Sequence, residues 1–190
     1  DIGDTPAVWN RWDGDMGELL VYDRALGASE RAEVREYLAG RYADAEALLR
    51  RVLDARPDDV PTLRALAEVC LRGLDRPETA IELCHRLATS GVEERSDFEL
   101  LAWSQMAAGR PADAEETWTA WLRRNPREVY AHGTRSTARK ALGNIKGAME
   151  YCDEMIRIDP RYARAYVNRG VLRDALRDLA GAIEDYDQAI

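Results

Sequence analysis

The sequence predicts an all-α protein, an α-solenoid of about five helix hairpins preceded by a short β-strand remnant. Three observations predict this fold. One short segment recurs at a fixed period along most of the 190 residues. Within the copies, apolar residues recur at steps of three and four, which is the spacing of one face of an α-helix. The first 27 residues lack the repeat. Because a period of about 20 to 50 residues is typical of solenoids and related arrays, the repeat decides the fold class.

At the N-terminus, residues 17–22 are predicted to form a β-strand, because a short apolar run lies there between glycines and the charged pair Asp23-Arg24. Residues 7–9 are a candidate for a second strand. The first 27 residues hold six acidic and two basic side chains, which is half of the net charge of −8. We therefore expect residues 1–27 to be a part distinct from the repeats.

An alanine marks the same place in every copy of the repeat. The four most similar copies begin at Arg41, Arg110, Asn144 and Asp178. The marker alanines are Ala45, Ala80, Ala114, Ala148 and Ala182. They are separated by 35, 34, 34 and 34 residues, so one extra residue lies in the second copy.

The turn inside each hairpin is marked by residues that start helices. Asn144 and Asp178 are natural N-caps, because their side-chain oxygens can accept hydrogen bonds from amides of the first helical turn. Pro77 and Pro111 suit the first helical position, where no backbone donor is needed. Each second helix is therefore predicted to begin beside one of these residues.

The second helices are predicted to end at proline or glycine. Pro57, Pro126 and Pro160 keep the phase of the repeat, and each lacks an amide donor and disfavours helix in the residue before it. The second copy ends instead near Gly91, which suits a left-handed C-cap. Small residues at the marker positions let two helices approach closely, so we expect Ala114 and Ala148 to be buried and residues 95–158 to form four helices.

This period and pattern resemble the tetratricopeptide repeat. The third copy carries the signature residues of that family at Phe98, Leu101, Ala102, Gly109, Ala114, Trp118, Trp121 and Pro126. The resemblance covers residues 28–190, in units of about 28–60, 61–94, 95–128, 129–162 and 163–190, the last of them truncated. It implies helix-turn-helix units stacked into a right-handed solenoid. The first helix of the first unit, residues 29–39, departs from the pattern and is expected to cap the array or to derive from another fold.

A second resemblance concerns the N-terminal segment. Residues 9–42 resemble the C-terminal tail of a laminin-G or concanavalin-like lectin domain, in which a last sandwich strand is followed by an Asp-Arg-Ala-Leu turn at Asp23–Leu26 and a closing helix. The resemblance implies that the rest of such a sandwich, with any glycan or calcium site, lies upstream of Asp1. The closing helix would then serve as the first helix of the repeats.

No catalytic or cofactor site is predicted. The two histidines, His85 and His132, lie 47 residues apart, and neither has a second ligand at metal-binding spacing. Cys70, Cys84 and Cys152 are isolated, so a disulfide framework is not expected. No phosphate loop or dinucleotide fingerprint occurs. We therefore expect no enzyme activity, no cofactor and no metal.

Charge and hydropathy bear on the partners. The chain has 27 basic and 35 acidic residues without a clustered basic face, which argues against nucleic acid as a partner. No stretch approaches 18 apolar residues, so neither a membrane span nor a leader is expected. Asp1 in place of Met indicates a fragment, and we expect the natural chain to continue past Ile190. A soluble protein is expected; its compartment stays open, and the lectin resemblance would imply an extracytoplasmic one.

The tetratricopeptide resemblance implies a ligand groove lined by the first helix of each unit. Trp103 is the largest side chain on that face, and packing against the neighbouring unit explains it as well as ligand binding does. Some members of the family hold a peptide carboxylate with a clamp of Lys, Asn and Arg; only Asn168 matches it, so no clamp is assigned. The candidate groove residues are Glu99, Trp103, Met106, Tyr130, Thr134, Thr137, Lys140, Val167, Asn168 and Val171.

Three functions remain open at this point. The leading hypothesis is a scaffold whose groove binds a peptide or a segment of a partner protein. The alternative is a spacer or assembly arm of a larger secreted or envelope protein, which would bind glycan only through the absent upstream domain. An enzyme would need a catalytic domain outside these residues.

Overall fold

A computed structural model describes the backbone of residues 28–91 and 94–190, and the side chains from Ala39 onward. In these residues the elements are α1 (Ala28–Ala55), α2 (Val60–Glu68), the π-helical turn η1 (Val69–Gly73), α3 (Pro77–Thr89), α4 (Arg95–Ala107), α5 (Pro111–Arg124), α6 (Val129–Ala141), α7 (Ile145–Ile158), α8 (Ala163–Ala175) and α9 (Leu179–Gln188). The chain divides into two compact units, Asp1–Arg41 and Tyr42–Ile190. The second unit holds the C-terminal half of α1 and every later helix.

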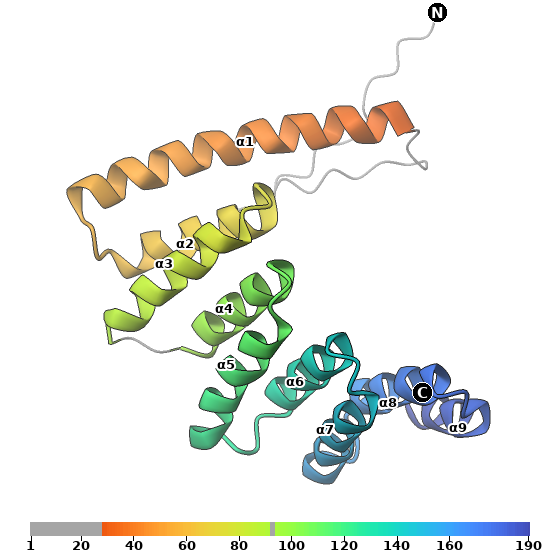
Figure 1. The fold of residues 1–190 in the computed structure, drawn as a ribbon. Helices are drawn as coiled ribbons and strands as arrows, with labels where there is room; N and C mark the ends of the chain where they lie inside the picture. The colour runs from red at the N-terminus through yellow and green to blue at the C-terminus, as the bar shows by residue number, and fades with distance from the viewer. Residues whose placement is uncertain (1–27, 92–93) are drawn as a thin grey trace, which may run out of the picture. The chain divides into compact units, whose positions relative to one another are not determined.

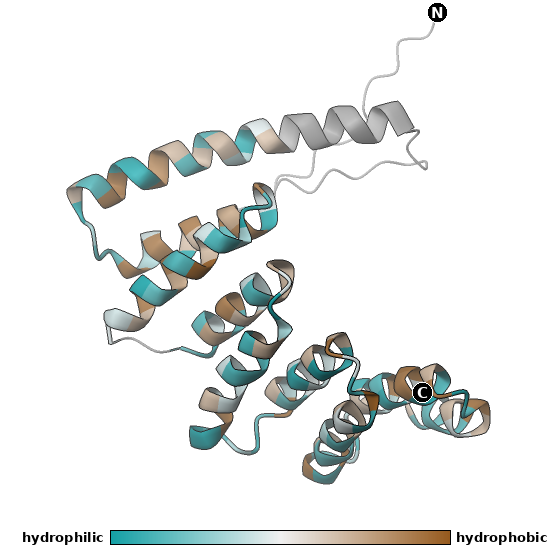
Figure 2. Ribbon diagram, in the orientation of Figure 1, coloured by the Kyte–Doolittle hydropathy of each residue, from teal (hydrophilic) through white to brown (hydrophobic). Residues whose placement is uncertain are grey.

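After α1, the second compact unit consists of helix hairpins. α2 packs on α3, α4 on α5, α6 on α7 and α8 on α9, and each hairpin also packs on the next through α3 and α4, α5 and α6, and α7 and α8 (Figure 1). Hydrophobic and hydrophilic residues are interleaved along these helices, as an amphipathic stack requires (Figure 2). The prediction that residues 95–158 form four helices is confirmed.

Close helix contacts at the marker alanines hold each hairpin together. Ala80, Ala114, Ala148 and Ala182 are all buried, as the repeat predicts, whereas Ala45 in α1 is only half-buried. The core around them is filled by large side chains, such as Trp118 in the second hairpin. An added methyl or larger group at these positions would meet a neighbouring helix, so the period of the sequence is the period of the closest helix contacts.

The helix starts and ends agree with the local signals. Asn144 and Asp178 accept hydrogen bonds from the amides of Gly147 and Gly181 at the starts of α7 and α9. Pro77 and Pro111 open α3 and α5, and α1, α5 and α7 each end two residues before a proline. After α3, Gly91 has the left-handed φ of +75° that favours glycine.

The extra residue of the second copy forms a π-helical turn. η1 continues α2 directly, between Pro57 and the marker Ala80, where the sequence is one residue longer than in the later copies. A π-helical turn has one more residue per hydrogen-bonded ring than an α-helical turn, so it takes up an insertion without shifting the residues on either side. Ala67 and Ala80 are therefore both fully buried.

The first copy of the repeat, residues 28–60, does not form a helix hairpin. The expected number of five hairpins is therefore not reached in the described residues. α1 runs without interruption through Gly40, where a turn was predicted between a helix at 29–39 and a second helix. In the later hairpins the turn contains a residue of positive φ, such as Gly109 or Gly143, followed by Pro, Asn or Asp. Arg41 and Tyr42 supply no such helix start, so the chain stays helical.

The N-terminal predictions lie outside the described residues. These are the strands at 7–9 and 17–22 and most of the lectin-like segment 9–42. In the part of the chain that the structure describes, all regular structure is helical. None of those helices has both the length and the apolar character that crossing a membrane requires.

Candidate functional site

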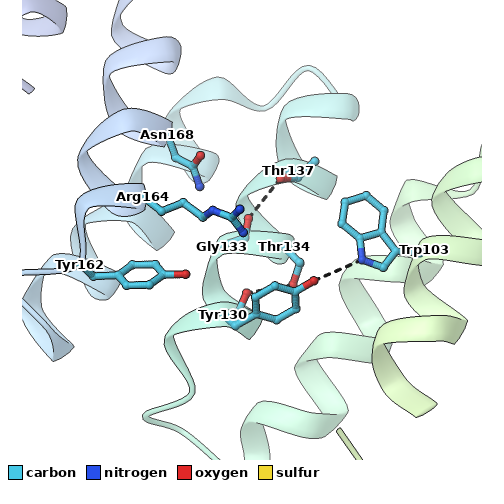
Figure 3. A pocket seen from close by; sticks show the side chains of 8 residues that line it. All are labelled: Trp103, Tyr130, Gly133, Thr134, Thr137, Tyr162, Arg164 and Asn168. Carbon is cyan, nitrogen blue, oxygen red and sulfur yellow. Dashed lines mark hydrogen bonds between the residues drawn. The ribbon is translucent and has the colours of Figure 1, made fainter. Parts of the chain in front are cut away.

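The first helices of three successive hairpins line a pocket. It has a volume of about 370 Å³ and lies over α4, α6 and the start of α8 (Figure 3). Its lining residues are Trp103, Tyr130, Gly133, Thr134, Thr137, Tyr162, Arg164 and Asn168. Three separate hairpins contribute, so the pocket exists only when they are stacked.

An aromatic pair forms the α4 side of the pocket. The Trp103 indole Nε1 donates to the Tyr130 hydroxyl at 3.3 Å, and that hydroxyl donates to Glu99 Oε1 at 2.6 Å. Arg95 lies 5.1 Å from the centre of the Tyr130 ring. Burial, followed by the hydrogen bond to Glu99, raises the pKa of Tyr130, so its hydroxyl remains a donor at neutral pH. This chain of contacts orients Trp103 while leaving it 39% exposed.

The floor of the pocket is α6, where the side chains are small. A Cβ at Gly133 would lie 3.1 Å from Met155 Cε, so the backbone of α6 packs closely on α7 there. The hydroxyls of Thr134 and Thr137 donate to carbonyls of the preceding turn of their own helix. Because these hydroxyls already donate to backbone carbonyls, the floor presents mainly threonine methyl groups to a ligand.

Polar side chains of α8 form the opposite side. Tyr162 precedes the first residue of α8, and Arg164 and Asn168 follow one turn apart on the same face (Figure 3). Within residues 94–190, the Tyr162 hydroxyl, the Arg164 guanidinium and the Asn168 amide make no hydrogen bond or ion pair. This wall therefore presents hydrogen-bond donors, one of them charged, to whatever enters the pocket.

The candidate groove residues fall into three groups. Trp103, Tyr130, Thr134, Thr137 and Asn168 line the pocket. Glu99 and Met106 do not line it: Glu99 accepts a hydrogen bond from Tyr130, and Met106 packs against the core of α4, α5 and α6. Lys140, Val167 and Val171 do not line it, and all three are exposed on the surface.

Three lining residues were not among the candidates. Gly133 and Arg164 stand on the same helix faces as the candidates beside them, so the repeat phase could have identified both. Neither residue type indicates a binding site by itself, because glycine has no side chain and an arginine at the start of a helix is common on protein surfaces. Tyr162 precedes its helix, and only the stacking of the hairpins brings it to the pocket.

The thiols offer no reactive group in this region. Cys70, Cys84 and Cys152 are all buried and unpaired with one another. Burial raises the pKa of each, that of Cys84 to about 12, so the thiols stay protonated at neutral pH. Among the described residues, no group of His, Cys, Asp and Glu side chains is arranged to hold a metal ion.

Comparison with known proteins identifies the repeats. Three family models described as tetratricopeptide repeat match residues 36–98, 100–163 and 163–190. Among curated proteins, none matches the chain.

Several solved structures have a similar fold. A crystal structure of MamA is 18% identical, with 87% of this chain and 94% of that chain covered and a TM-score of 0.67. TTC0263, a thermophilic TPR protein of Thermus thermophilus, is 22% identical, with coverage of 84% and 87% and a TM-score of 0.61. YrrB, described as a TPR protein with an unusual peptide-binding site, is 17% identical, with coverage of 86% and 85% and a TM-score of 0.61. At these identities the likeness concerns the fold alone.

Proposed function

Because residues 36–190 of this chain belong to the tetratricopeptide repeat family, we propose that it is a protein-interaction scaffold whose pocket over α4, α6 and α8 binds a peptide segment of a partner protein. Stacked helix hairpins present extended surfaces formed by equivalent helices, and such surfaces suit a peptide better than a small substrate. The observation that carries the proposal is the pocket itself, which joins an exposed, oriented Trp103 to a wall of unpartnered polar groups.

The two walls of the pocket define the ligand. Trp103 gives a flat apolar surface at one end, and aromatic anchors of this kind dominate the energetics of peptide interfaces. Arg164 and Asn168 at the other end supply donors for a carboxylate or a backbone carbonyl. We expect a peptide that places an apolar or aromatic side chain against Trp103 and an acidic side chain near Arg164.

Selection of displayed peptides on the immobilised chain, followed by affinity measurements, tests the proposal. Trp103→Ala should weaken a selected peptide by about 2 kcal/mol or more, which is about thirtyfold. Arg164→Ala should weaken peptides with an acidic residue about tenfold and leave neutral variants of the same peptide nearly unchanged.

Matched controls come from residues outside the pocket. Arg161 and Glu116 are exposed, and neither lines it. Arg161→Ala and Glu116→Ala should therefore bind like the unmodified chain. Equal losses for these controls, or unchanged affinity for Trp103→Ala with its helical circular dichroism intact, would place peptide binding elsewhere.

A further inference from the structure

The pocket over α4, α6 and α8 has room for one large side chain. Its volume of about 370 Å³ is near the lower end of the range for ligand pockets, which is about 300 to 1,000 Å³. Trp103 of α4 and Arg164 of α8 both line this single space, on opposite sides of it (Figure 3). One side chain of a bound peptide therefore meets the aromatic side and the polar side together.

The α8 side offers three hydrogen-bond donors above the floor of the pocket. Figure 3 shows the Tyr162 hydroxyl and the Arg164 guanidinium directed from α8 toward α6, with the Asn168 amide beside them. The Asn168 amide nitrogen lies 3.8 Å from the position that a Cβ on Gly133 would take. A longer side chain at residue 133 would extend into the space in front of the donors, so the glycine leaves that space to a ligand.

The pocket has a positive charge without a counter-charge. Among the described residues that line it, Arg164 is the one charged side chain, and none is an aspartate or a glutamate. The acidic residues closest in the chain to the lining residues do not line it; they are Glu99, Glu128 and Asp159. Glu99 already accepts a hydrogen bond from Tyr130 and lies 3.7 Å from Arg95. The charge of Arg164 is therefore left for the ligand to neutralise.

The number of donors favours a phosphate over a carboxylate. A carboxylate has two oxygens, and two parallel N–H groups of one guanidinium already pair with both. The Tyr162 hydroxyl and the Asn168 amide would then compete for the remaining lone pairs. A phosphate monoester has three terminal oxygens and a charge of about −1.5 to −2 at pH 7, so each of the three side chains can donate to it.

We propose that the pocket binds a phosphotyrosine side chain of the partner protein, with the phosphate held by Tyr162, Arg164 and Asn168 and the ring lying against Trp103. The inference rests on the proposed function, since it names the residue of the bound peptide that fills the pocket. The ring is flat and apolar, which matches the exposed indole and the methyl groups of the floor. Phosphoserine and glutamate carry an anion without a ring, so they satisfy only the α8 side.

Nuclear magnetic resonance of the ¹⁵N-labelled chain tests the inference, with N-acetyl-phosphotyrosine amide as the probe. The indole N–H signal of Trp103, assigned with Trp103→Phe, should shift on binding. The probe should bind at least about tenfold more tightly than N-acetyl-tyrosine amide, because charge-assisted hydrogen bonds are added. It should also bind more tightly than the same derivatives of phosphoserine, glutamate and sulfotyrosine, and more tightly than inorganic phosphate.

Variants of the α8 side separate the contributions of the donors. Arg164→Lys keeps the charge but loses the two parallel donors, so it should weaken the probe, though less than Arg164→Ala does. Tyr162→Phe and Asn168→Leu each remove one donor and should weaken it about threefold to tenfold. Binding of N-acetyl-tyrosine amide should stay the same in Arg164→Lys and Tyr162→Phe, which separates loss of a phosphate contact from damage to the pocket.

The matched control is Arg161→Ala. Arg161 is an exposed arginine just before α8 that does not line the pocket, so this variant should bind the probe like the unmodified chain. Circular dichroism checks that every variant is folded. A loss in Arg161→Ala as large as that in Arg164→Ala would reduce the binding to general charge attraction and overturn the proposal.

Three further results would overturn it. Equal affinity for the phosphotyrosine and tyrosine probes would remove the phosphate contact, and equal affinity for phosphotyrosine and phosphoserine would remove the ring contact. Sulfotyrosine binding as tightly as phosphotyrosine would show that the site does not select a phosphate.

The displayed peptides, which carry no phosphate, test the proposed function separately. Peptides that bind through Trp103, together with a probe that gains nothing from its phosphate, would retain the peptide function and exclude phosphotyrosine. A probe that binds as expected without any selected peptide would support the phosphotyrosine site and exclude unmodified peptides as ligands. Failure of both measurements would overturn both proposals.

Discussion

At the scale of single residues, small side chains determine how closely the helices of a hairpin approach. Ala114 is 1% exposed and lies in the core of the second hairpin, beside Trp118 and under Trp103. Gly170 makes an equivalent contact in the last hairpin, because a Cβ there would lie 2.6 Å from Tyr186 Cε1. A protein interior is packed without room for an added branch, so these positions tolerate little growth.

Ala114→Leu should destabilise the protein by about 1 to 3 kcal/mol, because the larger side chain forces α4 and α5 apart. Urea unfolding measured by circular dichroism gives the free energy of unfolding. Ala112→Leu is the matched control, since Ala112 is exposed on the same helix and its replacement should change stability by less than about 0.5 kcal/mol. Similar values for the two variants would contradict the close contact at Ala114.

Cys84 should make stability depend on pH in the alkaline range. Burial raises the pKa of its thiol from 9.0 to about 12, so above pH 9 the unfolded chain loses this proton while the folded chain keeps it. The contribution of Cys84 is therefore fully present below about pH 9 and is lost progressively toward about pH 12. Urea unfolding at a series of pH values should show a shallower decline for Cys84→Ala than for the unmodified chain. An identical slope would exclude Cys84 as the titrating group.

At the scale of elements, glycines at the same position of the repeat lie in two different structures, one in a turn and one inside a continuous helix. Gly143 lies in the turn between α6 and α7 with φ of +75°, followed by the N-cap Asn144. Gly40 holds the equivalent place in the first copy but lies inside α1, followed by Arg41. A glycine permits a left-handed turn without requiring one, and a turn forms where the next residues can also start a helix.

Replacing each glycine by alanine should therefore change stability in opposite directions. Gly40→Ala should stabilise the protein by about 0.5 to 1 kcal/mol, since alanine favours the helix and nothing lies within 4 Å of the added Cβ. Gly143→Ala should destabilise it by about 1 to 2 kcal/mol, because alanine disfavours positive φ. Thermal unfolding of both variants checks the signs. Destabilisation by Gly40→Ala would mean that the chain turns there in solution.

At the scale of the whole molecule, stability is shared between neighbouring hairpins. Arg169 of α8 joins Asp153 of α7 to the buried Asp185 of α9, and Arg139 of α6 holds Glu115 of α5. Ion pairs of this kind join a hairpin only to its immediate neighbour. In such an array the stability of a unit depends on how many neighbours cover it.

Amide hydrogen exchange at low protein concentration should accordingly be faster in α9 than in α5 and α7. These inner helices are covered on both sides, whereas the outer face of α9 is exposed. Mass spectrometry of exchanged peptides measures the difference. Uniform protection from α5 to α9 would indicate one cooperative unit instead of a graded array.

The site could be predicted from the sequence only in part. The repeat phase places Trp103, Tyr130 and Asn168 on first-helix faces, and the structure brings these three to one pocket. It does not bring Val167 or Lys140 there. The position of a residue within the repeat shows on which face of its own helix the side chain lies. Which side chains line one pocket depends in addition on how neighbouring hairpins are rotated against each other.

The sequence by itself determined the repeat, the buried marker alanines, and the helix ends at Asn144, Pro126 and Gly91. These features act through backbone hydrogen bonds and steric limits within a few residues, so they can be read locally. Only the tertiary structure decided that α1 is continuous, that η1 absorbs the extra residue, and that Arg164 faces Trp103. Each of these depends on how well alternative arrangements pack, and that balance is set by contacts between residues far apart in the chain.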